Sequence, residues 1–339
     1  MNQKDRFSQI IAGNELKKYT LLKKGELSYN HGNSKLAKYG TVFVQDSHDK
    51  ALVPRVYHSF KMVAQNNPYF IEYLFASGLP NKELSKIVTS GARMDGLLNI
   101  NKKEFFSIKL NNPSSEEQSS VAKLFQSLDK TITLHEEKHR QLERLKKALL
   151  QKMFADETGY PALRFKGFTE KWEQRKLGET VVNIVAGGDI NKAELLSKGK
   201  YPVYANALTN NGIVGYYASQ YRIAAPAVTV TGRGDIGIAK ARDINFTPVV
   251  RLLAISSQHN NYFLENLINT HRSFAESTGV PQLTVPQLSN YKLYFPQKIN
   301  EEVFIGKLFK KMDHLTTLHQ HKIDNLKRLK RALLQKMFV

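Results

Sequence analysis

Two histidines and a glutamate near the middle of the chain have the spacing of a zinc hydrolase motif. His135, Glu136 and His139 fit His-Glu-x-x-His, in which two histidines one helical turn apart bind zinc and the glutamate activates water. The same stretch recurs later in the chain, where Ile323 stands in place of His139. A position that accepts isoleucine is a packing position, so we expect no metal site here.

A glycine-rich segment follows a predicted strand. Residues 232–237, Gly-Arg-Gly-Asp-Ile-Gly, fit the G-x-G-x-x-G pattern that holds a pyrophosphate at the start of a helix. The next residues, 238–242, are strand-like and lead to Pro248, so the helix that this chemistry needs is missing. We expect a tight turn between strands. It is either a structural hairpin or a DNA-facing loop in which Arg233 and Lys240 reach phosphate or guanine.

A third motif resembles the Asn-Pro-Pro-Tyr sequence that holds the target amine in adenine methyltransferases. Asn66-Asn67-Pro68-Tyr69-Phe70 lacks the second proline, and no separate glycine-rich cofactor motif accompanies it. Asn67-Pro68 is better explained as a helix start. The sequence therefore predicts a chain without catalytic residues, bound cofactor or metal.

Composition points to a polyanionic partner. The 339 residues include 50 Lys and Arg against 30 Asp and Glu, a net charge of +20, and the excess is spread along the chain. A field of this sign attracts nucleic acid. The length suits two domains, and the chain has no cysteine, no run of about 18 apolar residues and no signal-peptide pattern at its start. We expect a cytoplasmic protein that makes no contact with membranes.

An internal repeat determines the architecture. Residues 124–154 align without gaps to residues 308–338, with 18 of 31 positions identical and an offset of 184 residues. Both copies have apolar residues at alternating three- and four-residue steps, the rhythm of a helix that packs on another helix. The simplest partner for each copy is the other, packed antiparallel. The helix seam is predicted to contain Leu128, Ile132, His135, Leu142, Leu149, Met312, His319, Ile323, Leu326 and Leu333.

A region of mixed character precedes each helix, which indicates an α+β fold. Residues 201–205, 213–217, 227–231 and 249–255 have strand patterns, and residues 259–268 have a helical one. In the first region, residues 69–74 (Tyr-Phe-Ile-Glu-Tyr-Leu) resemble residues 262–267 (Tyr-Phe-Leu-Glu-Asn-Leu). The predicted order is a partial first recognition domain (1–112), a first spacer helix (113–154), a linker (155–171), a second recognition domain (172–297) and a second spacer helix (298–339).

These features together resemble the specificity subunits of type I restriction-modification systems. The resemblance rests on the doubled domain-plus-helix arrangement, on Ala-Leu-Leu-Gln-Lys-Met-Phe closing both helices, and on residues 161–168 and 172–179, which open the second unit. It implies two target-recognition domains, each reading half of a split site in double-stranded DNA, held apart by two antiparallel coiled-coil helices. It also implies partners: adenine methyltransferase subunits and a restriction and translocase subunit.

The front of the chain departs from the family pattern. A family member would begin with its own version of residues 172–179, whereas Met1 aligns to the interior of the domain. We expect the first target-recognition domain to be truncated, so that specificity is concentrated in one half-site.

Base-reading candidates are the polar and aromatic residues expected on turns of the second domain. Asn pairs bidentately with adenine and Arg with guanine. The basic runs 140–147 and 327–331 are either solvated helix faces or contacts to the DNA backbone or the methyltransferase. The DNA-binding candidates are Tyr204, Asn206, Asn210, Asn211, Tyr216, Tyr217, Arg222, Arg233, Lys240 and Arg272.

The predicted function is that of a non-catalytic scaffold that recognises DNA sequence for a methyltransferase and endonuclease complex. Three alternatives stay open at this stage: a DNA-binding protein that acts alone, an enzyme such as a methyltransferase or metallohydrolase, and an inactive remnant of a recombining specificity locus.

Overall fold

Each copy of the sequence repeat forms one long helix in the computed structural model of the chain, which describes residues 18–32, 37–63, 65–89, 97–207, 209–271 and 282–338. Helix α4 (Ser115–Met153) and helix α8 (Ile299–Met337) each have 39 residues. Both carry two glutamates in the first turn, where negative charge interacts favourably with the helix dipole. Helix α4 thus begins two residues after the predicted start of the first spacer helix at residue 113.

The chain divides into two compact units, and the division cuts both long helices. Unit 1 contains Met1–Glu136 and Gln320–Val339, and unit 2 contains Glu137–His319. Each unit therefore has one globular domain and a segment of both α4 and α8. The two units are described separately below.

In both units the start of one long helix packs against the end of the other. In unit 1, the rings of Phe125 on α4 and Phe338 after α8 lie 5.9 Å apart within one apolar cluster. In unit 2, the rings of Phe309 on α8 and Phe154 after α4 lie 5.8 Å apart. The helices are thus antiparallel, and the predicted α+β fold class with its paired helices is confirmed.

The ten predicted seam residues all lie at buried or half-buried positions. Ile132, Met312 and Ile323 are buried. The half-buried members are Leu128, His135, Leu142, Leu149, His319, Leu326 and Leu333.

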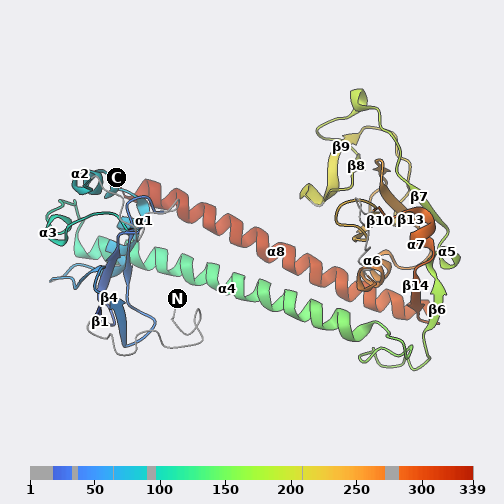
Figure 1. Ribbon diagram of the computed structural model, residues 1–339, viewed down its shortest axis with the longest axis horizontal. Helices are drawn as coiled ribbons and strands as arrows, with labels where there is room; N and C mark the ends of the chain where they lie inside the picture. The colour runs from blue at the N-terminus through green and yellow to red at the C-terminus, as the bar shows by residue number, and fades with distance from the viewer. Residues whose placement is uncertain are drawn as a thin grey trace. The chain divides into compact units, whose positions relative to one another are not determined.

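In the described residues of unit 1, two small sheets and three short helices accompany the first part of α4. Strand β2 is central in the antiparallel order β3-β2-β5, and β1 pairs with β4. Helix α1 lies beside α4, where Tyr73 contacts Phe125 (Figure 1). The elements are β1 (Tyr19–Lys23), β2 (Leu27–Asn30), β3 (Thr41–Val44), β4 (Lys50–Pro54), β5 (His58–Phe60), α1 (Pro68–Ser77), α2 (Asn81–Ile87) and α3 (Lys102–Phe105).

Unit 2 contains a four-stranded sheet in the order β11-β10-β13-β7, a three-stranded sheet β12-β8-β9 and the pair β14-β6. Helix α6 packs on α8 through a core that includes Trp172, Phe263 and Phe309 (Figure 1). The elements are β6 (Glu173–Lys176), α5 (Leu177–Thr180), β7 (Asn183–Ala186), η3 (Lys192–Glu194), β8 (Tyr201–Tyr204), η4 (Thr209–Gly212), β9 (Ile213–Tyr217), β10 (Ala227–Thr231), β11 (Ala239–Arg242), β12 (Thr247–Pro248), β13 (Leu252–Ser256), α6 (Asn261–Thr270), α7 (Val285–Ser289) and β14 (Lys292–Phe295).

Helices α1 and α6 attach to the long helices in the same way. Asn67 caps α1 and Asn260 caps α6, each through a side-chain oxygen that accepts two backbone N–H groups. The backbone N–H of Asn67 donates to Gln118 on α4 at 3.0 Å, and that of Asn260 donates to Glu302 on α8 at 3.4 Å. Gln118 and Glu302 are repeat equivalents, so the repeat includes the junction between domain and helix as well as the helix itself.

In the part of the chain that the structure describes, no helix combines the length and apolar character needed to cross a membrane.

Candidate nucleic-acid interface

The Gly-Arg-Gly-Asp-Ile-Gly segment is the connection of a β-hairpin. It joins the antiparallel strands β10 and β11, and Gly234 and Gly237 have positive φ angles of 73° and 78°. Arg233 is exposed at its start. No helix follows, so the prediction of a turn between strands is confirmed, and the arrangement lacks the helix N-terminus that a pyrophosphate needs.

Asn206 holds this hairpin in place. Its side-chain oxygen accepts the N–H of Gly232 at 2.7 Å and that of Arg233 at 3.3 Å, and its amide nitrogen donates to the Arg233 carbonyl. Because both ends of the amide are occupied by backbone, Asn206 has the geometry of a residue that positions Arg233. The sequence analysis proposed that Asn206 itself reads a base. That role stays a prediction, and in the structure the Asn206 amide is bonded to the backbone of Gly232 and Arg233.

A tight turn formed by Val249–Leu252 lies against the hairpin. The Leu252 N–H donates to the Val249 carbonyl at 3.0 Å, and Arg251 within the turn has a φ of 72°. A side chain at Gly232 would overlap the Arg251 carbonyl oxygen, so only glycine permits this approach. The hairpin and the turn therefore place Arg233 and Arg251 on neighbouring stretches of backbone.

The other side of the turn contacts a glycine pair. A side chain at Gly187 would overlap the Val249 carbonyl, and the Val250 N–H donates to the Gly188 carbonyl at 3.1 Å. The Arg222 guanidinium lies against Gly188 and donates to the Asp189 carbonyl at 2.6 Å. Arg222 is exposed, so a third arginine borders the same group of loops.

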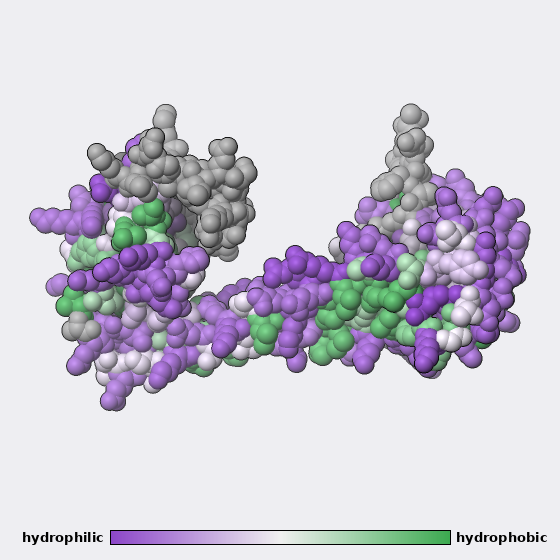
Figure 2. All heavy atoms as spheres, turned by 90° about the horizontal axis from the view of Figure 1, so that it is seen from below, coloured by the Kyte–Doolittle hydropathy of each residue, from purple (hydrophilic) through white to green (hydrophobic). Residues whose placement is uncertain are grey.

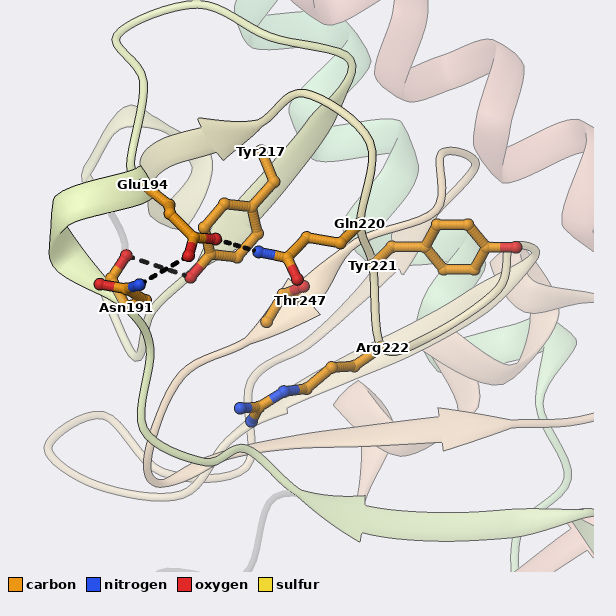
Figure 3. A pocket seen from close by; sticks show the side chains of 7 residues that line it. All are labelled: Asn191, Glu194, Tyr217, Gln220, Tyr221, Arg222 and Thr247. Atoms are coloured by element: carbon orange, nitrogen blue, oxygen red, sulfur yellow. Dashed lines mark hydrogen bonds between the residues drawn. The ribbon is translucent and has the colours of Figure 1, made fainter.

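Arg222 also lines a polar pocket of about 200 Å³. Figure 3 shows Asn191, Glu194 and Gln220 converging within it, while the ring of Tyr221 points away from them. The Glu194 carboxylate accepts hydrogen bonds from Asn191 at 2.7 Å and from Gln220 at 2.6 Å. The pocket thus presents amide, carboxylate and guanidinium groups, the types that pair with base edges. Its lining residues are Asn191, Glu194, Tyr217, Gln220, Tyr221, Arg222 and Thr247.

Two predicted base-reading tyrosines are buried. The sequence analysis counted Tyr204, Tyr216 and Tyr217 among turn residues, although it also predicted strands at residues 201–205 and 213–217. The three tyrosines lie on β8 and β9, so the strand prediction holds and the turn placement is wrong. Tyr204 is 6% exposed and Tyr217 is 5% exposed. Tyr204 lies in a stretch of β8 that is buried on both faces, and on β9 the burial alternates, so that Tyr217 is buried whereas Tyr216 is half-buried.

Tyr204 supports a buried arginine. The Arg242 guanidinium lies 3.7 Å from the centre of the Tyr204 ring, and it donates to the Thr229 hydroxyl at 2.9 Å and to the Asn211 carbonyl at 3.1 Å. Burial lowers the pKa of Arg242, and the Tyr204 phenol acts in the opposite direction. Arg242 therefore fixes the Asn210–Asn211 turn, a role that the sequence analysis missed.

The remaining candidates occupy three surroundings. Asn210 and Asn211 are exposed with φ angles of 48° and 54°, which asparagine tolerates, and the Asn210 amide donates to Ile213 at 3.0 Å. Lys240 is half-exposed on β11 and lies 3.8 Å from Glu265. Arg272 lies outside the described residues.

The residues of the zinc-like motif have other partners. Glu136 pairs with Lys327 of α8 at 2.6 Å, and His139 lies 3.5 Å from Glu143. Among the described residues, no group of three or more metal-ligating side chains comes together. The motif positions belong to the helix pair.

The repeated domain and helix correspond to two matches with one protein family. The sequence model described as "Type I restriction modification DNA specificity domain" matches the chain twice, over residues 2–144 and 169–328. The chain belongs to this family. Each match to the specificity domain includes one globular domain and most of one long helix, so the family resemblance stated from the sequence is confirmed.

Curated relatives belong to the same family at low identity. A Mycoplasma pneumoniae protein named as a type I specificity subunit is 26% identical over 204 residues, covering 58% of this chain and 53% of that protein. The specificity subunit of the type I restriction enzyme MjaVIII of Methanocaldococcus jannaschii is 24% identical over 296 residues, covering 77% of this chain and 68% of that protein. The chain thus spans about half the length of the first relative.

A solved structure shares the fold. The crystal structure of the S subunit of a type I restriction-modification system from M. genitalium matches with a TM-score of 0.67 at 16% identity, over 95% of this chain and 85% of that chain. At this identity the likeness concerns the fold alone. The family match begins at residue 2, and the expected truncation of the first domain stays a prediction.

Proposed function

We propose that this chain is the DNA sequence-specificity subunit of a type I restriction-modification complex. In this role it reads a bipartite site in double-stranded DNA, docks adenine methyltransferase subunits and contributes no catalytic group. The observation that carries the proposal is the double family match, which coincides with the structural repeat. A chain that repeats one domain and one long helix suits a site made of two half-sites.

Charge supports DNA as the ligand. The net charge of +20 favours a polyanion, and Arg222, Arg233 and Arg251 are exposed on the adjoining loops of unit 2. Guanidinium groups fit both phosphate oxygens and the guanine edge. We place the complex in the cytoplasm, with a restriction and translocase subunit as a further partner.

The exposed apolar residues of the long helices support a partner that is present twice. Leu134 and Leu329 in unit 1 are 49% and 47% exposed, and Leu318 and Leu145 in unit 2 are 40% and 52% exposed. Leu318 is the repeat equivalent of Leu134, and Leu329 that of Leu145. Green patches along the helices in Figure 2 show that apolar side chains are exposed on the face drawn there. Two matched patches suit two copies of one methyltransferase subunit.

Co-expression with an adenine methyltransferase subunit of a type I system tests the proposal. Size-exclusion chromatography should give one complex, and sequencing of methylated random DNA should give a defined motif. The double variants Leu134→Asp/Leu329→Asp and Leu145→Asp/Leu318→Asp should each remove one methyltransferase copy. Separate elution of the wild-type chains in low salt would contradict the proposal. Specific DNA binding by the chain alone would favour a freestanding DNA-binding protein, and a stable complex without any motif would favour an inactive remnant.

A further inference from the structure

Arg251 occupies a backbone conformation that its side chain disfavours. Its φ is 72°, and it is the third residue of the turn closed between Val249 and Leu252. Glycine or asparagine is the usual residue at such a position, because a long side chain costs free energy there. Three described non-glycine residues have positive φ, and the other two are the asparagines Asn210 and Asn211.

Packing of the side chain does not explain why an arginine occupies position 251. Arg251 is exposed, and its guanidinium donates to the Gln282 side chain at a long 3.3 Å. The turn needs only backbone groups: the Leu252 N–H, the Val250 N–H and the Arg251 carbonyl that faces Gly232. A glycine would form the same turn without strain. Strained residues of this kind concentrate at functional sites.

The surroundings of Arg251 supply positive charge and amide groups. Gly232 lies against its carbonyl, Arg233 follows Gly232 directly, and the backbone of Gln282 bridges to Arg233. Among the described residues of unit 2, neither Arg233 nor Arg251 forms an ion pair with a carboxylate. Two exposed guanidinium groups on adjoining backbone, neither of them in an ion pair with a carboxylate of the described residues, form an anion-attracting surface.

We propose that Arg251, together with Arg233, is a DNA-contacting residue of the second domain. The inference rests on the proposed function and deepens it. The guanidinium fork of Arg251 takes a pair of acceptors, which DNA offers both as the O6 and N7 atoms of guanine and as phosphate oxygens. Asn206 acts as a positioning residue in this arrangement, because it fixes the hairpin that carries Arg233.

The decisive variant is Arg251→Gly, tested in the complex with the methyltransferase. Glycine adopts the positive φ freely, so the melting temperature should stay within a few degrees of wild type or rise. DNA binding should weaken about 5- to 150-fold, the range for loss of one bidentate contact. Arg251→Asn is a second variant that tolerates the turn and lacks the guanidinium. Arg175→Ala on the exposed strand β6 removes the same charge elsewhere in unit 2 and should leave binding nearly unchanged.

Two arms distinguish the sources of the acceptors. If the contact is to guanine, the Arg251→Gly complex relaxes its methylation motif at one position. If the contact is to phosphate, the motif is kept, binding falls uniformly, and the slope of affinity against salt decreases by about one unit.

Either arm supports the inference, and two results would overturn it. One is an Arg251→Gly complex that binds DNA with wild-type affinity and keeps the wild-type methylation motif. The other is failure of both the glycine and asparagine variants to fold, which would make Arg251 a structural residue. A wild-type complex that shows no specific methylation would contradict the proposed function itself, and this result is separate from any effect of the variants.

Discussion

Lys330 on α8 forms an ion pair with Asp129 on α4, with 2.5 Å between Nζ and Oδ1. Their repeat equivalents, Lys146 and Asp313, form the same pair in unit 2 with the helices exchanged. In unit 1 the Tyr73 hydroxyl also donates to Asp129 at 2.8 Å. The repeat therefore conserves an interhelical contact as well as a heptad pattern, and each unit contains one copy of that contact.

These ion pairs should contribute modestly to stability and strongly to pairing specificity. Because both partners are partly exposed, solvent screening limits each pair to about 0.5–1 kcal/mol. Lys330→Glu should cost more, about 1–2 kcal/mol, since it places a carboxylate against Asp129. The double exchange Lys330→Glu/Asp129→Lys should recover part of that loss in a double-mutant cycle measured by urea unfolding. Additive effects of the two single changes would show that the pair does not couple.

A carboxyl beside each ion pair, buried in unit 2 and half-buried in unit 1, predicts a pH dependence. Burial raises the pKa of Glu265 on α6 and that of Glu72 on α1, the corresponding position of the first domain. A raised pKa means that the folded state holds the proton more tightly than the unfolded state does. The free energy of unfolding therefore falls as the pH rises from the ordinary glutamate value through the raised one.

Glu265→Gln should remove the part of this dependence that arises in unit 2 and should raise the melting temperature at pH 7. Thermal unfolding between pH 4 and pH 8 measures it, and Glu173→Gln on the exposed strand β6 serves as the control. If the melting temperature of Glu265→Gln fell between pH 5 and pH 7 by as much as that of the wild type, the assignment of the pH dependence to Glu265 would be wrong.

The linker between the two family matches is anchored by a buried ion pair. Arg164 donates to both carboxylate oxygens of Glu301, at 2.8 and 2.7 Å, and the Trp172 indole N–H donates to the same carboxylate at 3.2 Å. Glu301 is 1% exposed, so Arg164→Met would leave an unpaired buried charge. We expect a loss of about 3 kcal/mol in urea unfolding. The double variant Arg164→Met/Glu301→Gln should regain much of this loss. If the single variant Arg164→Met and the double variant were equally stable, the unpaired charge of Glu301 would not be the cause.

Glu136 should be dispensable for function. Glu136→Ala removes its ion pair with Lys327, which is about half exposed and worth less than about 1 kcal/mol. DNA binding and methylation should remain at the wild-type level. Metal analysis of the purified chain is the check, because one equivalent of zinc that disappears in the variant would revive the hydrolase interpretation.

The sequence predicted the helices well because their signals are local and repeated. Residues 69–74 and 262–267 have the same pattern, and the structure shows them as α1 and α6 with matching asparagine caps. The strand predicted at residues 249–255 begins only at Leu252. Val-Val-Arg-Leu contains no turn residue, so the positive φ of Arg251 was invisible to the pattern.

The candidate interface was harder to predict because it depends on approaches between distant segments. Asn206 was chosen as a polar residue near a turn, yet its amide is occupied by the backbone of a hairpin 27 residues away. Tyr204 and Tyr217 looked exposed, but β8 is buried on both faces at Tyr204, and alternation along β9 turns Tyr217 inward. The Gly187-Gly188 pair was the available signal, since adjacent glycines mark a close approach of backbone.

The relative contribution of the two domains to specificity is the last prediction. Sequence analysis leads us to expect that one half-site, read by the second domain, dominates. The structure adds the Arg251 turn to the loops that carry Arg222 and Arg233 as the surface we propose for this reading. In that case each mismatched base pair in this half-site should cost about 1–3 kcal/mol. Substitutions in unit 1 should then change mainly the salt dependence of DNA binding, because nonspecific attraction to phosphate falls steeply with salt. Methylation mapping on random DNA decides the question, with Arg233→Ala as the variant expected to relax the dominant half. A motif with two equally strict halves would show that the first domain reads DNA as well as the second does.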